Sequence, residues 1–181
     1  RTNFQSRAIE EGLLRANIPY KLLGTRFFQR KEVKDVLAWM RLALEPTREA
    51  DKIRAVASPP RGIGAVTLAK LAAGQRTALR AADIAKVEAF EQMVSELAGA
   101  SETLAPSEFV KLVIEKSGMR KALFDEGSEE DRERFENIEE LASVAARHDG
   151  TPGREGIAAF LAEAALASDQ NTATLAPTTI S

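Results

Sequence analysis

The sequence contains no cysteine and only one histidine, His148, among its 181 residues. The absence of cysteine excludes disulfides and thiolate ligands, and it favours a cytoplasmic protein. Together with the single histidine, it argues against a zinc site and against a histidine-based catalytic triad. The phosphate-binding pattern GxxxxGK[ST] is also absent, so the chain is not expected to hydrolyse a nucleotide by itself.

Long apolar runs are missing as well. The sequence has no stretch of about 18 apolar residues and no signal-peptide pattern, so neither a membrane span nor secretion is expected. Hydrophobic residues make up 44% of the chain, which is enough for a real core in a soluble globular protein. The chain begins at Arg1 instead of methionine, which suggests a fragment of a longer protein.

The formal net charge is only −2, which argues against a protein that coats nucleic acid electrostatically. The charge is nevertheless distributed unevenly. Residues 1–61 carry 13 Lys and Arg against 7 Asp and Glu, whereas residues 62–181 carry 12 against 20. We therefore expect any DNA contact in the basic N-terminal third and the turn that follows it, with the acidic remainder as scaffold or partner surface.

The segment SPPRGIGAVTLAKL, residues 58–71, carries the strongest functional signal. Two amphipathic helical patterns flank a turn rich in proline and glycine, which is typical of a helix-hairpin-helix. Gly62 and Gly64 can adopt positive φ and bring bare backbone close to a ligand, and the N–H groups that start the second helix are unpaired. This pattern predicts a grip on DNA phosphates without regard to base sequence. An ordinary turn between two packed helices remains the alternative.

Most of the chain shows helical periodicity. The clearest helix is expected at about residues 30–44, where Glu45-Pro46 ends it and Trp39 lies beside the apolar stripe as a packing residue. Its stripe consists of Val33, Val36, Leu37, Met40 and Leu44. Before it, a helix at residues 5–16 and a short strand, IPYKLL, form a small αβ piece. The expected fold is therefore mainly α, with a helical subdomain after this piece.

Further helices are expected along the acidic part of the chain. Periodicity over residues 76–99 allows a division into two helices near Asp83, and a helix follows from Pro106 to Gly118. Ser128 is the expected N-cap of a long helix, whose early acids Glu129, Glu130 and Asp131 suit the helix dipole better than a metal site. A last helix carries Ile157, Phe160, Leu161 and Ala164, and a polar linker is expected from Ser168 onward.

Four segments, in order, resemble superfamily 1 DNA helicases of the UvrD, PcrA and Rep type. RTNFQSRAIEEGLL and LGTRFFQRKEVKDVLAWMRL are similar to elements of the second RecA-like domain, subdomain 2A, while PPRGIGAVTL and ERFENIEELASVA resemble the hairpin and a helix of the inserted subdomain 2B. Together these segments cover about residues 1–168. The resemblance implies three parts: a partial subdomain 2A at 1–45, a helical subdomain 2B at 46–168, and a linker back toward 2A at 169–181.

The resemblance also implies where DNA binds. Arg1 and Asn3 would border the single-stranded DNA track, and the hairpin would meet the duplex ahead of the fork. The expected duplex-contacting residues are Arg61, Gly62, Ile63, Gly64 and Thr67. Neither a catalytic residue nor a cofactor is expected in the fragment itself, because ATP and Mg²⁺ would be bound by the remaining helicase domains of the parent protein.

Two functional hypotheses follow. In the first, the chain is a fragment of an ATP-dependent 3′-to-5′ DNA helicase of the bacterial cytoplasm and nucleoid, in which the accessory subdomain contacts duplex DNA and regulates unwinding by rotation. In the second, it is a protein-interaction or autoinhibitory helical module whose acidic helices at 106–148 bind a partner without direct DNA contact. A stand-alone helix-hairpin-helix protein without a motor is a third, less favoured reading.

Overall fold

In the computed structural model, residues 27–173 are described, with side chains described from 27 to 168. All regular elements in this part of the chain are helical, which confirms the expectation of a mainly α fold. The predicted αβ piece at residues 5–23, together with Arg1 and Asn3, lies outside the described residues. The helices are α2 (Lys31–Leu44), α3 (Glu49–Ala57), α4 (Ala65–Ala72), α5 (Ala81–Ala100), α6 (Pro106–Lys116), α7 (Glu129–Ala145) and α8 (Arg154–Ala173).

Short helical turns connect these helices. They are η1 (Phe27–Gln29), η2 (Arg76–Ala78), the π-turn η3 (Lys121–Asp125) and η4 (Ala146–His148). Where the chain is described, no helix is long and apolar enough to cross a membrane. The predicted capping box of α7 is present, because Ser128 and Asp131 exchange side-chain and backbone hydrogen bonds.

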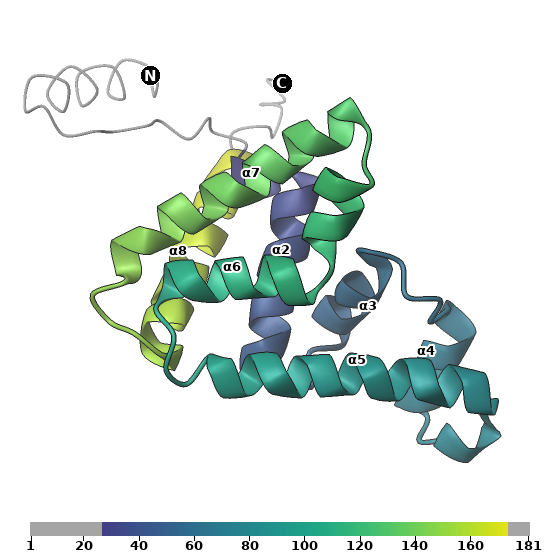
Figure 1. The fold of residues 1–181 in the computed structure, drawn as a ribbon. Coiled ribbons are helices and arrows are strands. Elements are labelled where there is room, and N and C mark those ends of the chain that lie inside the picture. The colour runs from purple at the N-terminus through teal and green to yellow at the C-terminus, as the bar shows by residue number, and fades with distance from the viewer. Residues whose placement is uncertain (1–26, 174–181) are drawn as a thin grey trace, which may run out of the picture.

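Helix α2 is the centre of the fold, with α5, α6, α7 and α8 packed around it (Figure 1). Its sequence is apolar on almost every side after the first turn, and Val33, Val36, Trp39 and Met40 are fully buried. A helix that is apolar all round must be covered on all sides, and the amphipathic neighbours supply that cover. Trp39 is therefore a core residue, as the sequence predicts, and it contacts Phe90 of α5.

One boundary agrees with the sequence-based prediction and one differs. The division expected near Asp83 lies at residues 79–80, between the short turn η2 (Arg76–Ala78) and helix α5, which starts at Ala81. Asp83 lies in its first turn and pairs there with Arg80, which places the acid at the positive end of the helix dipole. The last helix, α8, continues to Ala173, beyond Ser168 where the sequence pattern predicts a linker.

Helix α4 lies apart from the bundle, beside the N-terminal half of α5 (Figure 1). None of its residues is fully buried, although Leu68 and Leu71 pack partly against the core. Leu68 and Leu71 line a hollow of about 300 Å³ that lies between α4, α3 and α5. The segment between α3 and α4 is therefore presented at the edge of the molecule.

Candidate nucleic-acid interface

The segment between α3 and α4 starts from a firm anchor on α2. The indole N–H of Trp39 donates to the carbonyl oxygen of Ser58 over 3.2 Å, and the Ser58 hydroxyl donates to Asp35 over 2.7 Å. Asp35 is buried and forms an ion pair with Arg54 of α3 at 2.6 Å. These contacts fix the point at which the chain leaves α3, because Ser58 is hydrogen-bonded to two buried residues of α2, Trp39 and Asp35.

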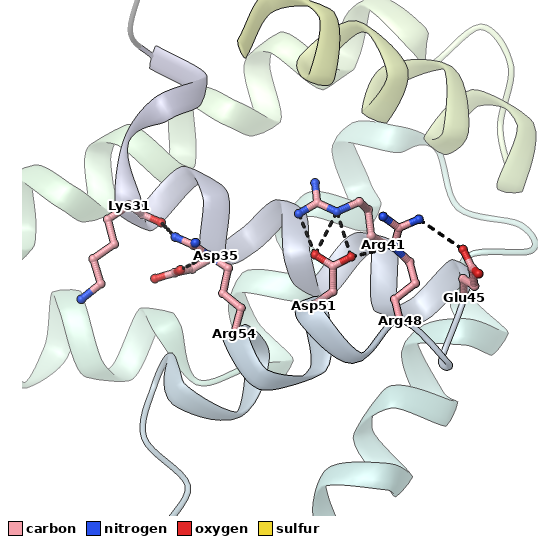
Figure 2. A network of polar contacts seen from close by, with 7 residues as sticks. All are labelled: Lys31, Asp35, Arg41, Glu45, Arg48, Asp51 and Arg54. Carbon is pink, nitrogen blue, oxygen red and sulfur yellow. Dashed lines mark hydrogen bonds and ion pairs between the residues drawn. The ribbon is translucent and has the colours of Figure 1, made fainter. Parts of the chain in front are cut away.

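A second ion pair joins the same two helices. Arg41 of α2 donates two close hydrogen bonds from Nε and Nη2 to Asp51 of α3, and Arg48 donates a third (Figure 2). Burial opposes the charged form of the Asp51 carboxyl, but the hydrogen bonds from Arg41 and Arg48 outweigh it and hold its pKa below the ordinary value. The base of the hairpin is thus held by two carboxylate and arginine contacts.

Arg61 points into the molecule. Its guanidinium lies over the Trp39 ring at 4.6 Å and donates to the backbone carbonyls of Ala55, Pro59 and Ser117. Within the described part of the chain it has no carboxylate partner, and burial lowers its pKa to about 10. The sequence places Arg61 at the duplex, whereas in this structure its side chain joins the hairpin to α3, to the core and to the end of α6.

The three residues after Arg61 have different conformations. Gly62 has φ of +65°, a conformation that glycine adopts at little cost. Ile63 turns its side chain inward and is 8% exposed, so only its backbone is available to a ligand. Gly64 has φ of −85°, so the positive φ that the sequence allows at both glycines occurs at Gly62 alone. A Cβ atom on Gly64 would meet nothing within 4 Å, which places this residue at an open surface.

Gly64 is the N-cap of α4, and no side chain caps this helix. The first hydrogen bond that reaches back to the cap runs from Leu68 N–H to Gly64 O at 3.1 Å. The N–H groups of Ala65, Val66 and Thr67 therefore have no partner within the described part of the chain. Val66 is 72% exposed and Thr67 is half-buried. Such a free helix N-terminus favours an anion.

Lys86 is a neighbour of the hairpin that the sequence analysis does not identify. This exposed residue of α5 donates from Nζ to the carbonyl oxygen of Gly62 over 3.3 Å. The contact places a positive charge at Gly62, two residues before the N-cap of α4. Only the tertiary fold brings Lys86 to Gly62, and the sequence pattern around Lys86 does not predict this contact.

The structure thus brings Arg61, Gly62, Ile63 and Gly64 together in one turn, with Thr67 in the first turn of α4 directly after it, and the side chains of Arg61 and Ile63 point inward. The arrangement can bind a phosphate through backbone donors and one lysine. In the described residues there is no group of three or more His, Cys, Asp or Glu that could hold a metal ion.

Residues 1–180 match the sequence pattern of a protein family described as "UvrD-like helicase C-terminal domain". Among curated proteins, the chain is 35% identical to the ATP-dependent DNA helicase PcrA of Bacillus subtilis, over 93% of the chain and 25% of that protein. It is also 35% identical to the ATP-dependent DNA helicase UvrD1 of Mycobacterium tuberculosis, over 88% of the chain and 23% of that protein. The chain therefore spans about a quarter of the length of these relatives.

Proposed function

Because this chain belongs to the UvrD-like helicase C-terminal domain family, we propose that it is the duplex-gripping part of an ATP-dependent 3′-to-5′ DNA helicase. The relatives named above are helicases, which supports DNA as the partner. ATP and Mg²⁺ would be bound by other segments of the parent protein, because the chain has no GxxxxGK[ST] loop. The remaining helicase domains would then pull on a single strand, near which Arg1 and Asn3 would lie.

The free N-terminus of α4 carries this proposal. A phosphate of the duplex would accept hydrogen bonds from the N–H groups of Ala65, Val66 and Thr67, and Gly62 and Gly64 would let the backbone approach it closely. Lys86 would add one charge to the contact. Because all of these groups address the DNA backbone, binding would not depend on base sequence, as a translocating helicase requires.

Arg61 would act in this grip as a positioning residue. Its hydrogen bonds to three carbonyls hold the turn in the shape that exposes the α4 donors. The two α2 to α3 ion pairs would hold the base of the same turn. Force applied to the duplex would then pass from the hairpin into the buried core around Trp39, and not into a mobile loop.

Replacing Gly64 with glutamate tests the proposal. A carboxylate near this open N-cap suits the dipole of α4, and a Cβ atom at Gly64 meets nothing within 4 Å, so the variant should fold. It should nevertheless repel a phosphate and weaken duplex binding about tenfold or more, measured by fluorescence anisotropy of a labelled duplex over a salt series. We expect wild-type binding to be weak and independent of sequence, with a salt slope of about one to three phosphates.

Gly99→Glu is the matched control. Gly99 is also exposed, has open space around its Cα and makes the same charge change, but it lies near the other end of α5. Duplex affinity should be unchanged in this variant. Equal affinity in Gly64→Glu and Gly99→Glu would contradict the hairpin grip and favour the second hypothesis, a helical module whose acidic helices bind a protein.

One observation favours that second hypothesis. A hollow of about 530 Å³ lies between α6 and α7, with Phe135 and Ile114 in its lining. Phe124 is 43% exposed and contacts Phe135 at a ring distance of 5.1 Å. A hollow with an exposed aromatic residue beside it could receive an apolar side chain of a partner protein. The anisotropy experiment above separates the two hypotheses, because a protein-binding module has no requirement for Gly64.

A further inference from the structure

A third hollow, of about 240 Å³, lies between α2, α3 and α8, on the side of the bundle where α8 runs past α2. Three cations line it, Lys34 and Arg41 from α2 and Arg54 from α3, and no acidic side chain does. The hollows between α6 and α7 and beneath α4 each have acidic and basic side chains in equal number. The hollow between α2, α3 and α8 therefore differs from the other two because the side chains that line it carry a net positive charge.

The two arginines are held in place by the buried carboxylates behind them (Figure 2). Arg54 contacts Asp35 through Nε and donates from Nη2 to the carbonyl oxygen of Lys31 over 3.2 Å. Arg41 uses Nε and Nη2 for Asp51, and its Nη1 makes no hydrogen bond within the described residues. Figure 2 shows this nitrogen turned away from Asp51. The guanidinium groups are thus oriented before any ligand arrives, which lowers the entropy cost of binding one.

Lys34 differs from the arginines because it has no hydrogen bond or ion pair from its side chain in the described part of the chain. It is half-buried, and Phe28 and the buried Leu37 lie beside it in the lining. An ammonium group without a partner gains from a bound anion, and the gain is larger in a partly enclosed hollow than in open water. Lys34 is therefore the cation in this hollow whose charge remains unmatched.

We propose that this hollow binds a phosphate group, with Lys34 as its main ligand, the free Nη1 group of Arg41 as an additional donor and the charge of Arg54 beside them. Its volume accommodates one tetrahedral anion or one phosphodiester of a strand that crosses the surface. The site stands on its own and does not depend on the hairpin, because its residues come from α2, α3 and α8. Bound there, a phosphate would neutralise Lys34 and link α8 to the α2 and α3 pair.

Lys34→Gln tests the site directly, because it removes the unmatched charge without disturbing either arginine pair. Inorganic phosphate is titrated into the 181-residue chain while backbone amide shifts are followed by NMR. We expect saturable shifts at residues 34–41, near Arg54 and at residues 164–168, and a loss of affinity of about tenfold in Lys34→Gln. Lys111→Gln is the matched control, because Lys111 lines the hollow between α6 and α7, which also contains acids.

The source of the phosphate is settled by parallel titrations with a single-stranded oligonucleotide and with a duplex. If a DNA strand supplies the phosphate, Lys34→Gln lowers the salt slope of binding to that form of DNA by about one. The same decrease should appear when Lys34→Gln is introduced into the Gly64→Glu variant, because the two sites are separate. If neither form responds but inorganic phosphate does, the hollow binds a free phosphate group. Phosphate shifts that are absent, or that are unchanged in Lys34→Gln, would overturn the proposal while leaving the hairpin grip untouched.

Discussion

The guanidinium of Arg61 is surrounded by three carbonyl oxygens and an indole ring. This half-buried cation is held by hydrogen bonds and by the π-face of Trp39, and no carboxylate of the described residues forms an ion pair with it. The sequence can identify Arg61 as part of a phosphate-binding turn, but it cannot tell an inward arginine from an outward one. The decisive partner, the carbonyl of Ser117, lies on another helix that only the fold brings near.

Arg61→Ala should therefore destabilise the protein as well as weaken DNA binding. Three carbonyls lose a charged donor and Trp39 loses its stacking partner, which should cost about 2 to 4 kcal/mol of unfolding free energy. Urea denaturation followed by Trp39 fluorescence measures this. The control, Arg80→Ala, removes a side chain that is 84% exposed and should change stability by less than about 1 kcal/mol. Wild-type stability combined with lost duplex binding in Arg61→Ala would instead make this side chain a direct DNA ligand.

At the scale of elements, the sequence pattern is most reliable where a helix is strongly periodic or clearly capped. It predicts α2 because Val33, Val36 and Leu37 repeat at helical spacing, and it predicts the start of α7 because Ser128 and Asp131 form a capping box. It also predicts a division near Asp83, which the structure has just before that residue, at the start of α5. It is less reliable at the end of α8, where the polar residues after Ser168 continue a helix.

The contact between α2 and α3 should weaken in acid. The pKa of Asp51 is lower in the folded protein than its ordinary value of 3.8, so its contribution to stability is present above about pH 3.8 and is lost as the pH falls through the folded value. Asp51→Asn should be destabilised by about 1 to 3 kcal/mol at pH 7, and the difference from wild type should shrink as the pH is lowered from 4 toward 2. Urea unfolding at a series of pH values measures this difference.

Glu45→Gln is the control for the acid experiment. Glu45 also contacts Arg48, but its side chain is 60% exposed, and an exposed pair contributes little to stability. Its difference from wild type should stay small at every pH. A gap between Asp51→Asn and wild type that stays constant down to pH 2 would show that the Asp51 carboxylate does not depend on Arg41 and Arg48 in the folded state.

On the scale of the whole molecule, the boundary before the helical subdomain stays a prediction, and the packing of α2 bears on where it lies. The expected division at Pro46 assigns residues 31–44 to the piece before the helical subdomain. In the structure, α2 supplies the centre of the core, with Trp39, Met40 and Val36 fully buried against the later helices. The order of motifs along a chain does not show which of two neighbouring subdomains a helix packs against. We therefore propose that the helical subdomain begins at α2. The chain segment that connects it to the preceding subdomain, and about which it could rotate, would then lie before Lys31.

Truncation tests this boundary. A chain of residues 27–173 keeps the complete core and should unfold in one cooperative transition, seen at the same temperature by far-UV circular dichroism and by Trp39 fluorescence. A chain of residues 46–173 loses α2 and exposes the apolar faces of α5, α6 and α7 that cover it, so it should lack a cooperative transition and bind the dye ANS. Cooperative melting of both chains at the same temperature would place the boundary at Pro46 after all, because α2 would then be dispensable for the core.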